Sequence, residues 1–304
     1  MNKGILLILS AALISGLSIF INKFGVEVVN PYVFTGLKNL ITVLFLLVII
    51  LSINEFNYFK KLTKKQWLQL VSIGFVGGGI PFLLFFKGLS MTTGAEGALI
   101  HKLMFLPVIL MAFIFLKEKV NKRLLIGAGF LILGTILLVK FNFNNIVFDK
   151  GDLLILIATL FWAVEQIISK KAVAEISPRI IAFGRLGFGF GFILLFWVFT
   201  GQLNLLTHLT WHQFNWALIT AILLLGYVLT WYTGLKYIKL SSAICILTLG
   251  APITTLLLMQ FNIGILLIIL GIILCLDFNW QLNTLFSRIS LVFAGQKIKK
   301  TKKN

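Results

Sequence analysis

Long apolar stretches, each separated from the next by a short polar or charged segment, dominate the chain. Ten such stretches occur, and most have the roughly 17–25 residues that a helix needs to cross a bilayer. They lie at about 4–22, 32–53, 67–86, 95–116, 123–139, 153–169, 180–200, 214–235, 241–259 and 262–277. Continuous runs of this kind fit spanning helices and not the alternating strands of a porin-type barrel. The pattern predicts an all-α polytopic membrane protein with ten transmembrane helices.

Composition supports this prediction. Of the 304 residues, 59% are hydrophobic and 12% are charged, against roughly 45–50% and about 25% in ordinary globular proteins. These values exclude a soluble enzyme, a disordered chain and a disulfide scaffold. Cys245 and Cys275 both lie within apolar runs and are expected to be buried thiols. Lys3 precedes an apolar stretch of about 18 residues, a length that predicts a spanning helix rather than a cleaved signal peptide.

The net charge of +18 would suit a nucleic-acid-binding protein, but basic residues also collect in the cytoplasmic loops of membrane proteins. Most of the 27 lysines and arginines fall in the segments that follow every second apolar run and in the tail at 280–304. We therefore expect no nucleic-acid partner. We expect a multi-pass protein of the cytoplasmic (inner) membrane with both termini in the cytoplasm and its basic tail on anionic lipid.

The two halves of the chain are related by an internal repeat. A shift of 147 positions aligns a lysine, a proline and an intramembrane cation of each half: Lys23/Lys170, Pro31/Pro178 and Lys38/Arg185. Further on, Leu89 matches Leu235 at a shift of 146, and Pro107 matches Pro252 at 145. Each half holds five apolar runs, so the second half must enter the membrane from the opposite side. Inverted repeats are typical of secondary transporters, whose substrate site lies between the halves.

These features together resemble the EamA family of the drug/metabolite transporter superfamily. The resemblance rests on the two five-span repeats and on the set Lys23, Pro31, Lys38, Gly88-Leu89, Pro107 and Leu-Lys-Glu-Lys at 116–119, before Gly127 and Gly134. It covers about 4–277 and implies a first five-helix repeat at 1–140, a second, inverted repeat at 141–279 and a basic tail at 280–304. It also implies a transporter rather than an enzyme, with a cavity lined mainly by the helices numbered 1, 3, 4, 6, 8 and 9 of the ten.

Polar and aromatic side chains inside the apolar runs are the candidates for substrate binding or coupling, because a charge at the membrane centre costs about 2.5–3.5 kcal/mol on insertion scales. The candidates are Trp162, Glu165, Ser169, Lys102, Tyr227 and Trp231. The first three are spaced i, i+3 and i+7, so they share one helix face. On such a face Glu165 either binds an ammonium group or exchanges a proton, or it pairs structurally with Lys170 or Lys171.

Two further pairs of residues occupy repeat-related positions. Lys38 and Arg185 are either gating cations that attract anions, or structural residues that form ion pairs or extend to the lipid headgroups. Pro107 and Pro252 interrupt two apolar runs and are predicted hinges, because proline removes a backbone hydrogen bond.

The sequence thus predicts a secondary transporter that moves a small metabolite, an amino acid or a related compound, by alternating access in the direction of export. Its partners are the substrate, the lipid bilayer and a coupling proton or counter-substrate, and it is a monomer or homodimer. No metal site and no cofactor are expected. An anion or phosphorylated-metabolite exchanger remains open, because the intramembrane cations outnumber the one firm acid, Glu165. A membrane-embedded lipid-processing enzyme is disfavoured by the scattering of the nine acidic residues.

Overall fold

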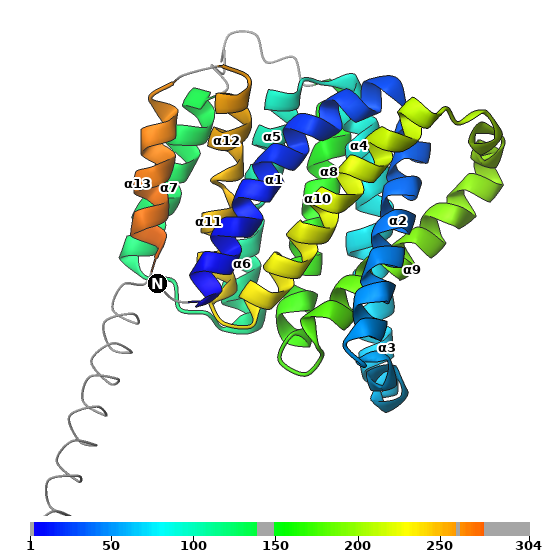
Figure 1. Ribbon diagram of the computed structural model, residues 1–304. Coiled ribbons are helices and arrows are strands. Elements are labelled where there is room, and N and C mark those ends of the chain that lie inside the picture. Colours follow the sequence, from blue (N-terminus) through cyan, green and yellow to red (C-terminus); the bar gives the residue numbers. More distant parts are fainter. Residues whose placement is uncertain (1–2, 139–148, 260–261, 277–304) are drawn as a thin grey trace, which may run out of the picture.

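A computed structural model describes residues 3–138, 149–259 and 262–276, apart from the side chain of residue 95. Within these ranges every regular element is helical and there is no strand, as the apolar runs predict. The helices form one bundle, in which helices from the two halves of the chain lie side by side: α10 packs along α1, and α13 along α7 (Figure 1). The basic tail predicted at 280–304 lies outside the described residues.

The first half of the chain contains seven α-helices and two short irregular helical turns in its described part. They are α1 (Lys3–Val28), α2 (Pro31–Ser52), η1 (Phe56–Lys61), α3 (Lys64–Ile73), η2 (Gly74–Gly79), α4 (Ile80–Met91), α5 (Gly94–Lys102), α6 (Phe105–Leu116) and α7 (Lys122–Leu138). The described part of the second half comprises α8 (Lys150–Ala172), α9 (Pro178–Thr200), η3 (Gln202–His208), α10 (Trp211–Leu235), α11 (Leu240–Leu247), α12 (Gly250–Leu257) and α13 (Gly264–Cys275).

Eight of the ten predicted spans coincide with described helices, or helices joined end to end, that are long and apolar enough to cross a membrane. These are Lys3–Val28, Pro31–Ser52, Lys64–Met91, Glu96–Leu116, Lys150–Ala172, Pro178–Thr200, Trp211–Leu235 and Leu240–Leu257. The other two runs correspond to α7, with 17 residues, and α13, with 12 residues in the described part. Large apolar side chains such as Leu13, Val48 and Phe113 are exposed on the outside of the bundle, as on a surface that faces lipid.

Three of the spans are not continuous α-helices. A π-helical turn at Gly74–Gly79 separates α3 from α4. The helices α5 and α6 meet at 103–104, just before Pro107, and α11 and α12 meet at 248–249, just before Pro252. Each proline lacks the N–H that would bond back across the break, so the helix cannot be continuous there.

The segments between the spans gather on two faces of the bundle. On one face Glu55, which follows α2, binds the guanidinium of Arg179 in the first turn of α9. On the other face Gln213, in the first turn of α10, donates a hydrogen bond of 3.1 Å to the carbonyl of Val28 at the end of α1. The segment after α2 therefore lies beside the start of α9, and the end of α1 beside the start of α10.

Candidate substrate site

A cavity of about 70 Å³ lies inside the bundle. Its polar walls come from α1, α2, α8, α9 and α10, and therefore from both halves of the chain. The polar lining residues include Ser18, Asn22, Lys38, Gln166, Arg185 and Tyr227, and aromatic rings of α4 and α8 complete the wall. A space of this size holds a few water molecules. The structure thus shows a small, polar, aromatic-walled chamber inside the bundle.

A buried charge cluster forms one side of this chamber. Glu165 on α8 has no exposed surface, and its carboxylate accepts hydrogen bonds from the hydroxyl of Ser169, the hydroxyl of Tyr232 at 2.7 Å and the amide of Gln166 at 2.8 Å. The Nη1 atom of Arg185 lies 3.9 Å from Glu165 Oε2 and donates to the Tyr232 oxygen at 3.2 Å. The two opposite charges neutralise each other, which lowers the cost of burying both.

The carbonyl of Gly77 extends this cluster to the irregular turn before α4. It accepts hydrogen bonds from Arg185 Nε at 3.1 Å and from the Trp162 indole at 2.8 Å. Pro81, four residues further on, has no N–H to offer this carbonyl as an α-helix would. The local break in the helix therefore provides the acceptor that orients the guanidinium and the indole.

The predicted aromatic pair on α10 lies beside the same cluster. The rings of Tyr227 and Trp231 stack with centroids 6.1 Å apart and planes 9° apart. The Trp231 indole donates to Gln166 Oε1 at 2.9 Å. Tyr227 lines the cavity, and Trp231 lies behind it.

The repeat-related cation, Lys38 on α2, has different surroundings. Its side chain is buried and its ammonium donates to Asn22 Oδ1 at 3.3 Å. The Nζ atom lies 3.6 Å from the centroid of the Phe86 ring, which gives a cation–π contact. Asn22 in turn donates to the hydroxyl of Ser18 at 2.8 Å. No carboxylate oxygen lies within 4.0 Å of this ammonium in the described part of the chain.

Adjacent residues of α5 point in different directions, as their spacing on the helix requires. His101 lines the cavity, with its ring centroid 4.8 Å from that of Trp162, and its Nδ1 atom is buried without a hydrogen-bond partner among the described residues. Lys102 instead donates to the hydroxyl of Ser15 at 2.7 Å. The Lys102 ammonium therefore packs against α1, and this residue is not among those that line the cavity.

The structure brings most of the candidates predicted from sequence to one place. The cavity wall holds Lys38, Trp162, Arg185 and Tyr227, and the residues behind it include Glu165, Ser169 and Trp231. Glu165 pairs with Arg185, while Lys170, its predicted alternative partner, donates to the carbonyls of Leu235 and Ile238. Sequence reasoning did not select Asn22, Ser18, Gln166 or Tyr232, whose importance depends on contacts between helices.

Comparison with known proteins assigns the chain to a family. The profile of the EamA-like transporter family matches residues 2–140 and 149–277. The protein belongs to the EamA-like transporter family. Two of its relatives are uncharacterized transporters of Bacillus subtilis (strain 168): YetK is 27% identical over 77% of this chain and 72% of its own length, and YyaM is 25% identical over 67% and 68%. Family membership confirms the resemblance predicted from sequence and identifies a membrane transporter.

The fold also matches a crystal structure. That structure superposes with a TM-score of 0.68 over 90% of this chain and 94% of its own chain, at 17% sequence identity. This level of identity establishes a shared fold. The cavity is therefore part of an architecture that this EamA-like transporter shares with another protein.

Proposed function

We propose that this protein is a secondary transporter that moves a small metabolite, an amino acid or a related compound, out of the cell by alternating access. The observation that carries the proposal is the cavity whose lining residues come from both halves of the chain. Its two cations, Lys38 and Arg185, occupy repeat-related positions 147 residues apart and line the same chamber. A site between repeats is the arrangement that alternating access requires.

The proposed architecture has ten spans in two inverted repeats, with α7 and α13 as the two shorter ones, and both termini in the cytoplasm. The odd number of predicted spans in each half and the distribution of lysines support this topology. The breaks before Pro107 and Pro252 are the proposed hinges, because each leaves a point without a backbone hydrogen bond at which a span can bend.

The second candidate function is exchange of an anionic or phosphorylated metabolite. It is favoured by Lys38, whose buried ammonium has no carboxylate partner among the described residues. In either case Trp162 and Tyr227 present aromatic surface to the substrate. Glu165 serves as a coupling acid if the Arg185 pair opens during the cycle, and binding of a proton then replaces the lost partner.

Reconstitution tests the proposed function directly. Purified protein is screened for metabolites that raise its thermal unfolding midpoint, since a ligand that binds only the folded state stabilises it. The compounds that do so are then loaded into proteoliposomes, and uptake of the labelled compound against the internal pool is measured. Exchange that requires the protein supports transport. Stabilising compounds that never cross the membrane would contradict it.

Two sets of variants test the topology and the hinges. Single cysteines at Lys64 and Asn204, in a background without Cys245 and Cys275, are labelled in cells with a membrane-impermeant thiol reagent. We expect labelling at residue 204 only, and the reverse pattern would overturn the orientation. Separately, Pro107→Ala and Pro252→Ala are expected to slow transport with little change in substrate binding. Unchanged turnover in both variants would show that the prolines are not hinges.

A further inference from the structure

The charges around the cavity do not balance. Arg185 is neutralised by Glu165, 3.9 Å away. Lys38 is as deeply buried, yet its only hydrogen bond in the described structure goes to the neutral oxygen of Asn22. The residues that line the cavity include no carboxylate at all. Among the residues that line the cavity, Lys38 is therefore the cation without a carboxylate partner; Lys102, whose buried ammonium binds Ser15, lies behind the wall.

An ammonium group in such a place needs an anion. Lys38 has three N–H donors, of which one is used, and a buried charge without a partner is strongly unfavourable. The three aromatic rings around the ammonium, with centroids 3.6 Å, 5.4 Å and 5.4 Å away, offset only part of that cost. The hydroxyl of Ser18 and the unpartnered Nδ1 of His101 also border the cavity and can complete the coordination of a bound group. Lys38 thus has two donors available for a ligand.

We propose that Lys38, oriented by Asn22, binds the carboxylate of a monocarboxylate substrate, an inference that rests on the transport function proposed above. The Lys38 ammonium contributes one positive charge to the wall, which matches the single negative charge of a carboxylate. A phosphate group, with a charge of about −1.5 to −2 near neutral pH, would need a second cation at the wall, and the nearby Lys102 is bound to Ser15 and is not a lining residue. The rest of the substrate lies against the rings of Phe82, Phe85 and Trp162, so it carries an apolar or aromatic body.

A matched series of compounds tests this assignment. The aliphatic set comprises leucine and 4-methylvalerate, which carry a carboxylate, and leucinamide, which does not. The aromatic set comprises phenylalanine and 3-phenylpropionate with a carboxylate, phenylalaninamide with an amide, and phenyl phosphate with a phosphate. Binding is measured as the shift of the thermal unfolding midpoint of the purified protein. We expect stabilisation by carboxylates only. The response to the amino acid relative to the simple acid then shows whether the substrate also carries an ammonium group.

Variants of the site separate binding from folding. Lys38→Met is expected to weaken carboxylate binding at least tenfold while the free protein stays folded. Asn22→Asp places a fixed carboxylate beside the ammonium and should block binding in the same way, although no cation is lost. Lys87→Met removes a lysine outside the cavity and is the matched control, with unchanged binding.

Several results would overturn the proposal. These are stabilisation by amides or phosphates instead of carboxylates, no stabilisation by any carboxylate of the series, or full binding by the Lys38→Met variant. Flux measurements distinguish failure of the proposed carboxylate site from failure of the transport proposal. Exchange of a compound without a carboxylate refutes the site and leaves transport intact, whereas carboxylate binding without flux refutes transport and leaves the site.

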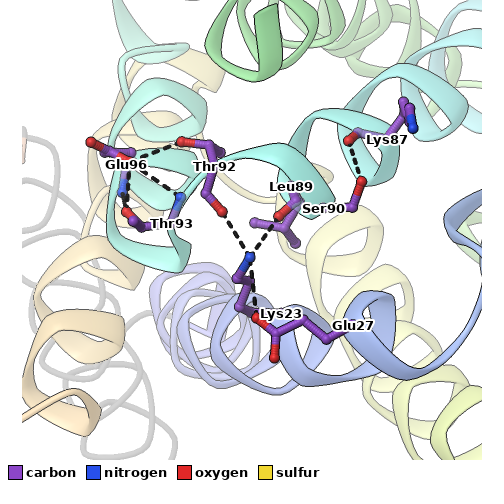
Figure 2. Close-up of polar contacts among 8 residues, drawn as sticks. All are labelled: Lys23, Glu27, Lys87, Leu89, Ser90, Thr92, Thr93 and Glu96. Carbon is purple, nitrogen blue, oxygen red and sulfur yellow. Dashed lines mark hydrogen bonds and ion pairs between the residues drawn. The ribbon is translucent and has the colours of Figure 1, made fainter. Parts of the chain in front are cut away.

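A second inference comes from two lysines near the ends of the bundle. Lys23 of α1 donates to the carbonyls of Leu89 at 3.2 Å and Thr92 at 2.8 Å, where α4 ends (Figure 2). Its repeat counterpart, Lys170 of α8, does the same where α10 ends, with the carbonyls of Leu235 at 2.6 Å and Ile238 at 2.7 Å. The two lysines are 147 positions apart, and the residues whose carbonyls they bind, Leu89/Leu235 and Thr92/Ile238, are 146 positions apart.

These two contacts lie on opposite faces of the bundle. Thr92, which binds Lys23, also donates through its hydroxyl to Asp152 in the first turn of α8, at 2.8 Å. Lys170 lies 18 residues further along the same helix, or about 27 Å at 1.5 Å per residue. The final carbonyls of a helix have no helical partner and carry partial negative charge, so an ammonium binds them well.

We infer that the two lysines are latches, one closing α1 against α4 on one face and the other closing α8 against α10 on the opposite face. Both lysines are engaged in this structure. Opening towards one face breaks only the latch on that face. Lys23 also pairs with Glu27 at 3.3 Å, which gives the released ammonium an alternative partner on its own helix (Figure 2).

Accessibility of a cavity residue tests the latches. Ser18→Cys, in a background without Cys245 and Cys275, is labelled with an impermeant thiol reagent in right-side-out and inside-out vesicles. Lys23→Met should raise the labelling rate several-fold from one face only, and Lys170→Met from the opposite face only. Lys23→Arg and Lys170→Arg, which can still donate to carbonyls, should restore the slow rate. Equal effects on both faces, or no effect in either variant, would refute the latches.

Discussion

Lys38 and Arg185 occupy corresponding positions in the two halves of the chain, and both are buried, but their charges are stabilised in different ways. Arg185 is paired with Glu165 and hydrogen-bonded to Tyr232. Lys38 has a neutral amide and three aromatic rings around its ammonium. The comparison teaches that matched sequence positions can have different surroundings: the fold supplies an acid to Arg185, whereas Lys38 has no carboxylate partner among the described residues.

The internal repeat shows which substitutions produce this difference. At the shift of 147 positions, Glu165 corresponds to Ser18, and at 146 Tyr232 corresponds to Phe86. The second half thus has an acid and a phenol where the first half has a hydroxyl and a phenyl ring. The same geometry provides a neutralised cation on one side of the chamber and a receptive cation on the other.

The largest expected effect comes from removing each cation in turn. Arg185→Leu leaves Glu165 buried without its partner, and we expect a loss of about 3–5 kcal/mol in stability. Lys38→Met removes a buried charge that has no partner, so stability should be unchanged or higher while carboxylate binding is lost. Thermal unfolding of the purified variants measures both. Equal destabilisation by the two substitutions would show that the fold stabilises the charges of Lys38 and Arg185 to the same extent.

A second substitution tests the same pair from its acidic side. Glu165→Gln keeps the shape and most hydrogen bonds but removes the charge, so we expect a smaller loss of about 1.5–3 kcal/mol, the range for hydrogen bonds to charged groups. If Glu165 is also the coupling acid, the variant that still folds transports with a flattened pH dependence. The double variant Glu165→Leu/Arg185→Leu should recover part of the stability that Arg185→Leu loses. A wild-type pH profile in Glu165→Gln would leave the acid a purely structural role.

The sequence predicts more of the fold than of the candidate site. Apolar runs predict spans because each run is a property of one segment, and eight of them coincide with long apolar helices. The i, i+3, i+7 spacing also placed Glu165 and Ser169 on one face, where they are hydrogen-bonded. The partner of Glu165 could not be predicted from sequence, because Arg185 belongs to another helix and local spacing favoured Lys170 or Lys171. The roles of Ser18 and Asn22 likewise depend on how α1 packs against α2.

A smaller effect is expected where a hydroxyl distinguishes the two halves. Tyr232→Phe reproduces on α10 the ring that Phe86 supplies on α4, and it removes one donor from Glu165 and one acceptor from Arg185. Hydrogen bonds between membrane helices average about 0.6 kcal/mol and reach about 1.7, so we expect a loss of about 1 kcal/mol. Tyr237→Phe, at an exposed ring, is the control. A loss as large as that of Arg185→Leu would mean that the phenol, not the carboxylate, holds the guanidinium.

The smallest effect is expected at the partly exposed ion pair between Glu55 and Arg179, which lies away from the buried contacts between the spans. Hydrogen bonds from Arg179 hold the pKa of Glu55 below its ordinary value. A carboxylate whose pKa is lower in the folded than in the unfolded protein stabilises the fold above the unfolded pKa of about 4.5. That contribution is lost as the pH falls through the folded pKa. Because both side chains are partly exposed, Glu55→Gln should cost at most about 1 kcal/mol at neutral pH and almost nothing in strong acid. Unfolding midpoints of wild type and variant at pH 3 and pH 7 measure this; a difference that does not shrink between pH 7 and pH 3 would show that the Glu55 charge is not its source.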